Sequence, residues 1–496
     1  MYQPKFHQLT FENFHLPFGG KLDPENRWVK LDAVIPWHVA ETMYAKNFLS
    51  KRGAPALTVR MALGSLIIKE KLGLSDIETV EQIKENPYLQ YFIGLAEYQH
   101  TAPFDASMMT HFRKRLKHTD LAALQEELLQ RHLAAEKARL KAKNEDDDDE
   151  GDDGSVNKGR LIVDATCAPA DIAYPTDISL LNDAREKTEL IIDTLCAMHP
   201  EGVTKPRMSR RTARKEFLAV GMKKSLSRKA LRKGLRKQLA YIRKNLQYIG
   251  NLSASVPLTV LSKHRYRDLL VIEELYRQQL EMYKSDTKSI SDRIVSISQP
   301  HVRPIVRGKA AAKTEFGMKL SISVVDGISM PERMSWNAYN EGCDLVRDIE
   351  RYRERYGHYP ESVHADKIYR TLANRMWCKE RDIRLSGVPL GRPPKDVEKN
   401  RARRRQIRED EGIRNAVEGK FGQAKRRYGL GRVMARLSES SLCVVSLTFL
   451  VMNLDRLLAL PFLRLFEWLL LELDVIQNLF KWSSSRAAMK CCWAMA

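Results

Sequence analysis

Three acidic residues stand where their carboxylates can meet. Asp164 follows the apolar run 161–163, Asp366 follows the segment 362–365, and Glu418 lies in a later helical stretch. Carboxylates at strand ends and on a facing helix can share a pair of divalent cations, which suits two-metal phosphoryl transfer. The pattern predicts that Asp164, Asp366 and Glu418 are catalytic metal ligands in a site that cuts phosphodiester bonds.

Basic residues flank Glu418 on its expected helix. At about 100° per residue, Glu418 and Lys425 lie within roughly 40° of Arg414, so the three side chains share one narrow stripe. The adjoining apolar stripe, which would dock this helix on a sheet, consists of Ile413, Val417, Phe421, Ala424 and Tyr428. Arg414 and Lys425 are therefore predicted to bind phosphate oxygens of DNA.

Each of these residues also has a structural interpretation. Arg414 and Glu418, at i and i+4, could form an ordinary surface ion pair. Asp164 could end a strand in a turn, and Asp366 could cap a helix. The catalytic interpretation depends on all three acids occurring together, in this order and in these types of element.

The elements around the acids predict an α/β domain that begins near residue 158. The expected strands are 160–166, 167–173, 314–327, 328–336, 362–366 and 382–385. The strand 167–173 is expected to be the hairpin partner of 160–166. The expected helices are 178–198, 341–356, 368–379 and two later basic helices, of which the second carries Glu418. The pair Asp326-Gly327 predicts a tight turn between two of the strands.

A strongly basic helical block interrupts this domain. Leucine and isoleucine recur at steps of three and four residues from Leu231 to Ile249, which is typical of a packed helix pair. Only Glu216 is acidic between Lys205 and Lys244, so we expect the outer face to follow a phosphate backbone. The candidate DNA contacts are Arg232, Lys233, Arg236, Lys237, Arg243 and Lys244.

The N-terminal part, about residues 36–137, shows the apolar spacing of several short helices. Its basic edge includes Arg113 and Arg115 as candidate DNA contacts. Such a unit could present a helix-turn-helix to a major groove. A plain helical bundle with a solvated basic face explains the pattern equally well.

Composition points to a polyanionic partner in a reducing compartment. The 496 residues carry a formal net charge of +21, which favours nucleic acid ahead of an anionic membrane. Seven cysteines form no paired Cys-x-x-Cys set, so we expect neither disulfides nor structural zinc. The first thirty residues lack a signal-peptide core, and the apolar stretch 441–454 falls short of the roughly 20 residues of a membrane span. Buried or oligomer-packing helices are the better interpretation of that stretch.

The short motifs around the acids carry a family resemblance. Asp164 in Leu-Ile-Val-Asp-Ala-Thr, Asp366 in His-Ala-Asp-Lys-Ile-Tyr, and Arg414-x3-Glu418-x6-Lys425 resemble the signature of RNase H-like DDE transposases encoded by bacterial insertion sequences. The segments 303–309, 315–319 and 335–340 also resemble one branch of that group, and the similarity extends from about residue 36 to about residue 460.

Two features depart from the family pattern. Family members often have a Tyr three residues before the Arg of the helix motif, where this chain has Glu411, so a role of that Tyr at the DNA end is not carried over. The interval between Asp164 and Asp366 is also long, because the basic helical block lies within it.

The resemblance implies an α/β RNase H-like core, a mixed sheet flanked by helices, with an all-α N-terminal domain and an inserted basic helical region. Asp164 would bridge two Mg²⁺ ions, for which Mn²⁺ can substitute, and Asp366 and Glu418 would each complete one coordination shell. Water would cut the strand at the element's end, and the freed 3′-hydroxyl would attack target DNA.

The resemblance also implies partners, location and a division of the chain. The partners would be double-stranded DNA, as element ends and target, and a second copy of the chain, with no membrane partner. The protein would act at the nucleoid in a bacterial cytoplasm. The expected domains are a helical DNA-end-binding domain (1–137), an acidic flexible linker (138–157), two parts of the core (158–200 and 301–435), the inserted basic region (201–300), and C-terminal apolar helices with a tail (436–496).

Two other functions share these features. A DNA-binding protein with an inert triad would bind DNA with steep salt dependence and never cut it. An RNase H-like nuclease would cut DNA without joining the 3′ end to a second duplex. Strand cleavage and strand joining separate the three hypotheses.

Overall fold

The structure is a computed structural model that describes residues 2–4, 10–16, 19–48, 55–143, 157–199, 202, 204–223, 225–306, 314–391 and 396–460. It divides into two compact units. The first comprises Met1–Gly151, Val324–Met330 and Ser446–Ala496, and the second comprises Asp152–Ser323 and Pro331–Val445. The predicted acidic run 145–154 and the tail beyond residue 460 lie outside the described residues.

The N-terminal part of the first unit is helical, as its apolar spacing predicted. After the short η1 (Phe11–Asn13) come α1 (Arg27–Val34), α2 (Trp37–Ala45), α3 (Val59–Leu72), α4 (Asp76–Glu85), α5 (Pro87–Phe92), α6 (Met108–Arg115) and α7 (His118–Lys143). Thr58 and Ser75 cap α3 and α4 by accepting from backbone N–H groups of their first turns. Helix α7 continues through residue 143, into the segment from residue 138 that we expected to be linker.

A C-terminal helix, Ser438–Leu460, is long and apolar enough to cross a membrane by length and composition, but 61% of its most apolar window is buried. Its polar groups find partners inside the first unit. Gln125 donates to the Ser446 carbonyl at 3.1 Å, and Asn453 donates to the Ser329 carbonyl at 2.9 Å. The helix is therefore a packing helix, as the apolar stretch 441–454 predicted.

The second unit is built on a mixed six-stranded sheet. The strand order is β2-β3-β1-β5-β6, and β4 also pairs with β3. The strands are β1 (Arg160–Pro169), β2 (Arg303–Val306), β3 (Thr314–Val325), β4 (Ile328–Ser335), β5 (Ser362–Ala365) and β6 (Arg384–Leu385). Strand β5 pairs in parallel with both β1 and β6, whereas β2 and β3 are antiparallel.

Strand β1 corrects one prediction. It runs on to Pro169, so the expected hairpin partner at 167–173 is wrong. Strand β3 takes that place, with the Ala170 N–H donating to the Phe316 carbonyl at 3.0 Å. The approach is close because Gly317 has no side chain; a Cβ there would lie 2.1 Å from the Ala168 carbonyl oxygen.

The hairpin between β3 and β4 confirms its turn signal. Asp326 and Gly327 have φ angles of 49° and 83°, the double left-handed conformation of a two-residue hairpin turn.

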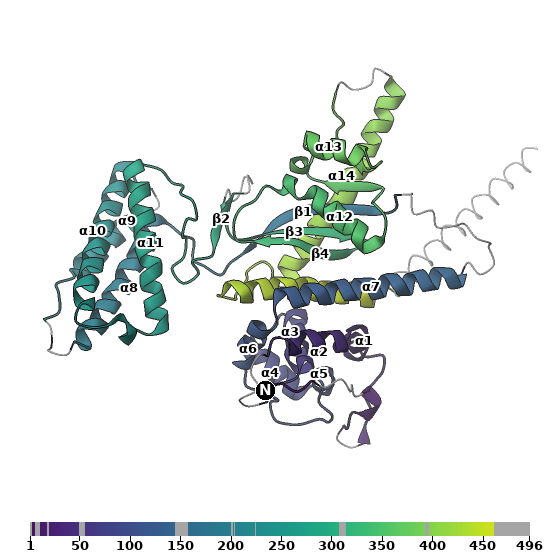
Figure 1. Ribbon diagram of the computed structural model, residues 1–496, viewed down its shortest axis with the longest axis horizontal. Coiled ribbons are helices and arrows are strands. Elements are labelled where there is room, and N and C mark those ends of the chain that lie inside the picture. Colours follow the sequence, from purple (N-terminus) through teal and green to yellow (C-terminus); the bar gives the residue numbers. More distant parts are fainter. Residues whose placement is uncertain are drawn as a thin grey trace, which may run out of the picture. The chain divides into compact units, whose positions relative to one another are not determined.

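Helices cover both faces of the sheet. They are η4 (Glu341–Cys343), α12 (Leu345–Tyr356), η5 (Lys367–Tyr369), α13 (Leu372–Lys379) and α14 (Val397–Arg427). Helix α14 crosses one face of the sheet and α12 lies on the other (Figure 1). The two basic helices predicted near Glu418 are one continuous helix of 31 residues, in which side-chain bonds such as Arg405 to Glu409 tie successive turns.

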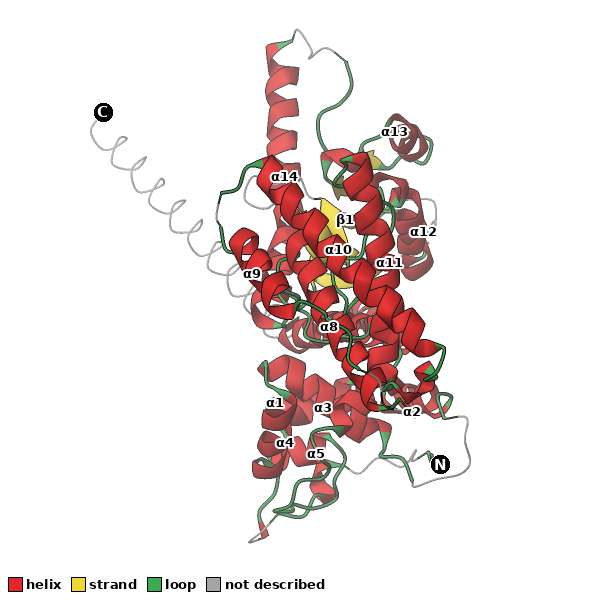
Figure 2. Ribbon diagram, turned by 90° about the vertical axis from the view of Figure 1, so that its left-hand side faces the viewer, coloured by secondary structure: helices red, strands yellow, loops and turns green. Residues whose placement is uncertain are grey.

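The inserted block is a bundle of long helices (Figure 2). Its members are α8 (Asp177–Ala197), α9 (Arg210–Gly221), α10 (Arg228–Ser253) and α11 (Lys263–Ser285). A short η3 (Leu258–Val260) lies between α10 and α11. Leu181 of α8, Leu239 of α10 and Ile272 of α11 belong to one buried cluster. Helix α8 thus packs in the bundle although it precedes the boundary expected at residue 200.

We predict that Gly317→Ala destabilises the second unit by about 1–3 kcal/mol, because the added methyl group forces β3 away from β1. Thermal unfolding followed by fluorescence measures the effect. Gly250→Ala is the matched control, since Gly250 lies in α10 with open space around its Cβ position and alanine favours helix there. A Gly317→Ala protein as stable as the control would contradict the close approach.

Candidate active site

Asp164 lies inside the central strand β1, between β3 and β5. Its side chain is partly buried, and Oδ1 accepts from the Ala165 N–H at 2.8 Å. The residue therefore does not end its strand, as the sequence suggested, but sits where β5 stops and β1 continues.

Asp366 is brought beside Asp164 by strand register. Val163 of β1 pairs with Ala365 of β5 in a parallel ladder, and the two aspartates are the next residue on each chain. Parallel neighbours lie about 4.8 Å apart and point their side chains to the same face. Asp366 also caps η5, because its Oδ1 accepts from the Lys367 N–H at 2.7 Å, so the structural interpretation holds together with the proximity.

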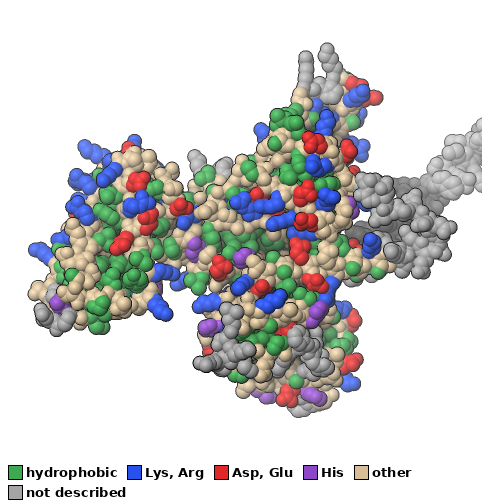
Figure 3. Space-filling model, in the orientation of Figure 1, with side chains coloured by type: hydrophobic (Ala, Val, Ile, Leu, Met, Phe, Trp, Pro, Cys, Tyr) green, Lys and Arg blue, Asp and Glu red, His purple; other side chains and the backbone are tan. Residues whose placement is uncertain are grey.

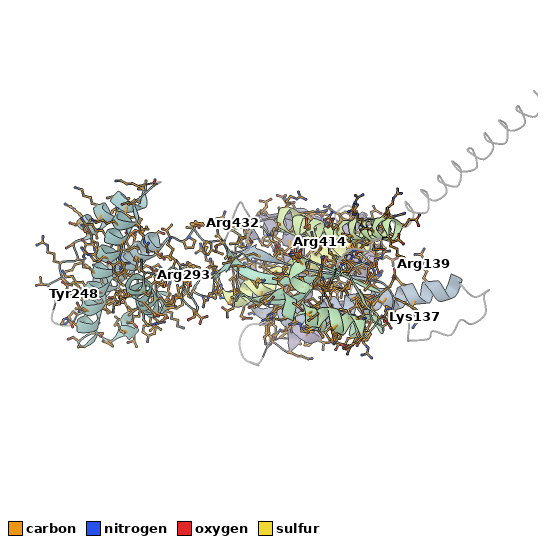
Figure 4. The ribbon with its side chains drawn as sticks, turned by 90° about the horizontal axis from the view of Figure 1, so that it is seen from above. Lys137, Arg139, Tyr248, Arg293, Arg414 and Arg432 are labelled. Atoms are coloured by element: carbon orange, nitrogen blue, oxygen red, sulfur yellow. The ribbon has the colours of Figure 1, made fainter. Side chains whose placement is uncertain are left out.

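Arg414 connects Glu418 of α14 to Asp366. The Arg414 guanidinium lies 3.8 Å from Asp366 Oδ1 and 3.6 Å from Glu418 Oε1. Arg414 is about one-quarter exposed, whereas both carboxylates are more than half exposed. Figure 4 labels Arg414 among the side chains of the second unit. The Arg414 guanidinium thus lies between the carboxylates of Asp366 and Glu418.

Helix α14 is fixed on the sheet by apolar and ionic contacts. Val417, Phe421 and Ala424 are buried, as the apolar stripe predicted. Asp410 of the same helix is also buried and accepts from Arg384 of β6 at 2.8 and 2.9 Å. These contacts hold the helix at the edge of the sheet that carries Asp366, which sets the position of Glu418.

Glu341 is a further carboxylate near Asp164 that the sequence analysis missed. It begins η4 and pairs with Lys319 of β3 at 2.7 Å, with both side chains largely buried. Asn374 holds η4 beside η5 by donating to the carbonyls of Gly342 and Tyr369 at 2.7 and 2.8 Å. The only sequence signal was its position directly after the family-like segment 335–340.

The electrostatics of the site are unusual at Asp164. Burial raises the pKa of Asp164 to about 6; Glu341 and Asp366 add to the rise, while the Ala165 N–H and Arg414 oppose it. Negative charge is therefore concentrated at a partly desolvated position, which a cation would relieve.

The site fits a hard divalent cation in the chemistry of its donors. Carboxylate oxygens are the ligands that Mg²⁺ prefers, and Asp164, Asp366 and Glu341 or Glu418 supply them. Within the described ranges, however, no group of three His, Cys, Asp or Glu side chains is already close enough to hold a metal ion. Arg414 separates Asp366 from Glu418, so coordination by both would require its guanidinium to move.

The candidate DNA contacts of the bundle lie on α10. Four of them are exposed: Lys233, Arg236, Arg243 and Lys244. Figure 3 shows several Lys and Arg side chains on the left part of the view, where Figure 1 labels α10. Arg232 instead pairs with Asp286 at 2.9 Å and stacks on Tyr283, and Lys237 pairs with Glu216. Contact with DNA stays a prediction for all six residues.

The three other candidates lie partly inside the protein. Arg113 donates to both carboxylate oxygens of Asp76, at 2.9 and 2.6 Å, and so ties α6 to α4. Arg115 lies over the ring of Phe48, 5.1 Å from its centroid. Lys425 is partly buried on α14. Their predicted binding to DNA would add to these contacts or replace them.

Two segments of the chain match known families. Residues 363–455 match the family model described as transposase DDE domain, and residues 17–115 match the model described as transposase domain (DUF772). A Rhizobium meliloti protein named "Uncharacterized protein ORF8 in nfe locus" is 36% identical over 159 residues, which are 32% of this chain and 69% of that protein. No solved structure matches the chain significantly. The first family match includes Asp366 and Glu418, and Asp164 precedes it.

We predict that Asp164→Asn stabilises the metal-free protein at pH 7. The folded-state pKa of Asp164 is raised, so its ionisation costs stability as pH rises from about 4 to about 6, and the penalty is complete at pH 7. Removing the charge should contribute on the order of 1–3 kcal/mol. Thermal unfolding in EDTA measures it, and the advantage should shrink as the pH falls from about 6 to about 4.

Asp193→Asn is the control of opposite sign. Burial raises the pKa of Asp193, but bonds from Arg210 and Lys205 outweigh it and lower the pKa overall. Its charge therefore stabilises the fold at pH 7, and the asparagine variant should be less stable. An Asp164→Asn protein that is destabilised like this control would contradict the charge distribution described for the site.

Proposed function

Because this chain belongs to the DDE transposases of insertion sequences, we propose that it binds the ends of its element, cuts the DNA there by metal-dependent hydrolysis and joins the freed 3′ end to target DNA. The observation that carries the proposal is the register that sets Asp164 beside Asp366, with Glu418 tied to Asp366 through Arg414. Three acids of the expected types thus lie around the point where β5 ends: Asp164 on the neighbouring strand β1, Asp366 directly after β5, and Glu418 on α14.

The strand order supports an RNase H-like assignment for the core. A central β1 has the β3–β4 hairpin on one side and the parallel strands β5 and β6 on the other. The acids lie on β1, directly after β5 and on the helix that crosses the sheet. A mixed sheet flanked by helices is also what the resemblance implied.

Each carboxylate has a defined part in the proposed reaction. Asp164, Asp366 and Glu418 would hold two Mg²⁺ ions, or Mn²⁺ in their place. When bound, the ions would supply Lewis acidity for the attacking and leaving oxygens of an in-line displacement. The pairing of β1 with β5 fixes the two aspartates, and the docking of α14 fixes the approach of Glu418.

The basic residues would position DNA around these acids. Arg414 and Lys425 would bind phosphate oxygens next to the scissile bond. The exposed face of α10 would add backbone affinity that is independent of base sequence, and the N-terminal helices would recognise the element ends. Because an element has two ends, we expect two copies of the chain to act together, on DNA of the bacterial nucleoid in the cytoplasm.

Alanine at Asp164, Asp366 or Glu418 should reduce cleavage to background while leaving the affinity for end DNA within about threefold. The substrate is a duplex taken from the DNA that flanks the coding region, where short inverted repeats would mark the ends. Strand cutting in Mg²⁺ is measured on denaturing gels, and joining is measured with a second duplex.

Glu398→Ala is the matched control, because Glu398 lies on the same helix about 30 Å from Glu418 at 1.5 Å per residue. It should cut like the wild type. Full cleavage by any of the three site variants would remove that residue from the site. Binding of end DNA without any cutting by the wild type would favour the inert DNA-binding protein.

A further inference from the structure

The N-terminal part of α14 carries four arginines that the proposed function does not use. We name Arg401, Arg404, Arg405 and Arg408 the arginine stripe. All four side chains of the arginine stripe are exposed, that of Arg405 to 84%. Their spacing of three and four residues places them within about 100° of one another around the helix axis.

The charges of the arginine stripe are poorly compensated within the protein. Arg405 pairs with Glu409 at 3.0 Å, but Arg401, Arg404 and Arg408 form no ion pair with any described residue. Like charges three and four residues apart repel and weaken a helix. A helix that retains four of them on one face fits a polyanionic partner better than a purely structural role.

The arginine stripe is also not packed on the rest of the unit. The first residue of the helix, Val397, is 80% exposed, and the nearest buried residue is Asp410. A bond from Arg403 to the Pro389 carbonyl at 3.3 Å is the side-chain contact that ties this part to the preceding loop. Figures 1 and 2 show this end of α14 extending away from the sheet.

The same helix connects the arginine stripe to the active site. At 1.5 Å per residue, Arg408 and Arg401 lie about 15 Å and 26 Å along the axis from Glu418. These distances correspond to about four to eight base pairs at 3.4 Å each. Gly412, which lies between the arginine stripe and Glu418, and Gly419, directly after Glu418, fall on the same face as the stripe. Both have open space at their Cβ positions, so a phosphate backbone can approach the helix closely there.

We propose that the arginine stripe binds the phosphate backbone of duplex DNA about four to eight base pairs to one side of the scissile phosphate. The proposal rests on the proposed function, since it places that phosphate at Asp164, Asp366 and Glu418. DNA is the partner because the charges lie on a straight continuation of the helix that carries a catalytic carboxylate. The contact is independent of sequence, because phosphates and not base edges are bound.

The test combines Arg401→Gln, Arg404→Gln, Arg405→Gln and Arg408→Gln in the full chain. Glutamine keeps helix propensity and removes four charges, so the fold should persist by circular dichroism. On duplexes that extend ten base pairs to each side of the cut, the slope of log affinity against log salt should fall by up to about 3.6. Single-turnover cleavage of saturated complexes should remain within about threefold of the wild type.

Duplex length locates the contact. On a duplex truncated to three base pairs on one side of the cut, the stripe variant and the wild type should bind with equal affinity. Truncation on the other side should leave the difference intact. The matched control removes four charges from α10, at Lys233, Arg236, Arg243 and Lys244, and its effect should not depend on this truncation.

An unchanged salt slope for the stripe variant on every duplex would overturn the proposal. That result is the one expected if the arginine stripe bound an acidic segment of protein instead of DNA. Failure of the proposed function is distinguishable from this result. If the wild type never cuts DNA, the proposed catalytic function is refuted. If the stripe variant still shows a lower salt slope than the wild type, on long duplexes only, the DNA contact of the arginine stripe is retained.

Discussion

The parallel pairing of β1 with β5 is the constraint on which the site depends. It sets Val163 opposite Ala365. Asp164 and Asp366, more than two hundred residues apart in sequence, are the next residues along the two chain segments, and the charge of Asp366 acts on Asp164. The helical insertion does not disturb this pairing, because α8 to α11 form a core of their own. A long insertion between the acids is therefore compatible with a compact site.

Placing the acids together has a cost that the rest of the unit offsets. Asp164 is partly buried near Glu341 and Asp366, and its pKa rises to about 6. Arg414 opposes this rise, and Lys319 pairs with Glu341 at 2.7 Å. The docking of α14 by Val417, Phe421 and Asp410 holds Glu418 near this charge without burying it. Such an electrostatic cost is common where a protein prepares a binding site for a cation.

Local patterns predicted much of this architecture. The turn pair Asp326-Gly327, the apolar stripe of α14 and the strand before Asp366 depend on neighbours in sequence, and the structure has all three. Features set by distant contacts were missed. Strand β1 continues past Thr166 because Gly317 admits β3, and Glu341 nears Asp164 only through η4 and η5. The catalytic roles of Asp164, Asp366 and Glu418 stay predictions, as their convergence on a metal is a property of the bound state.

Anomalous diffraction from crystals of the protein in Mn²⁺ tests that convergence most directly. We predict two peaks at this edge of the sheet, both about 2.1 Å from Asp164 oxygens, with Asp366 and Glu418 each on one of them and the Arg414 guanidinium displaced. Ordered Mn²⁺ elsewhere, with Asp366 and Glu418 still joined through Arg414, would contradict the account.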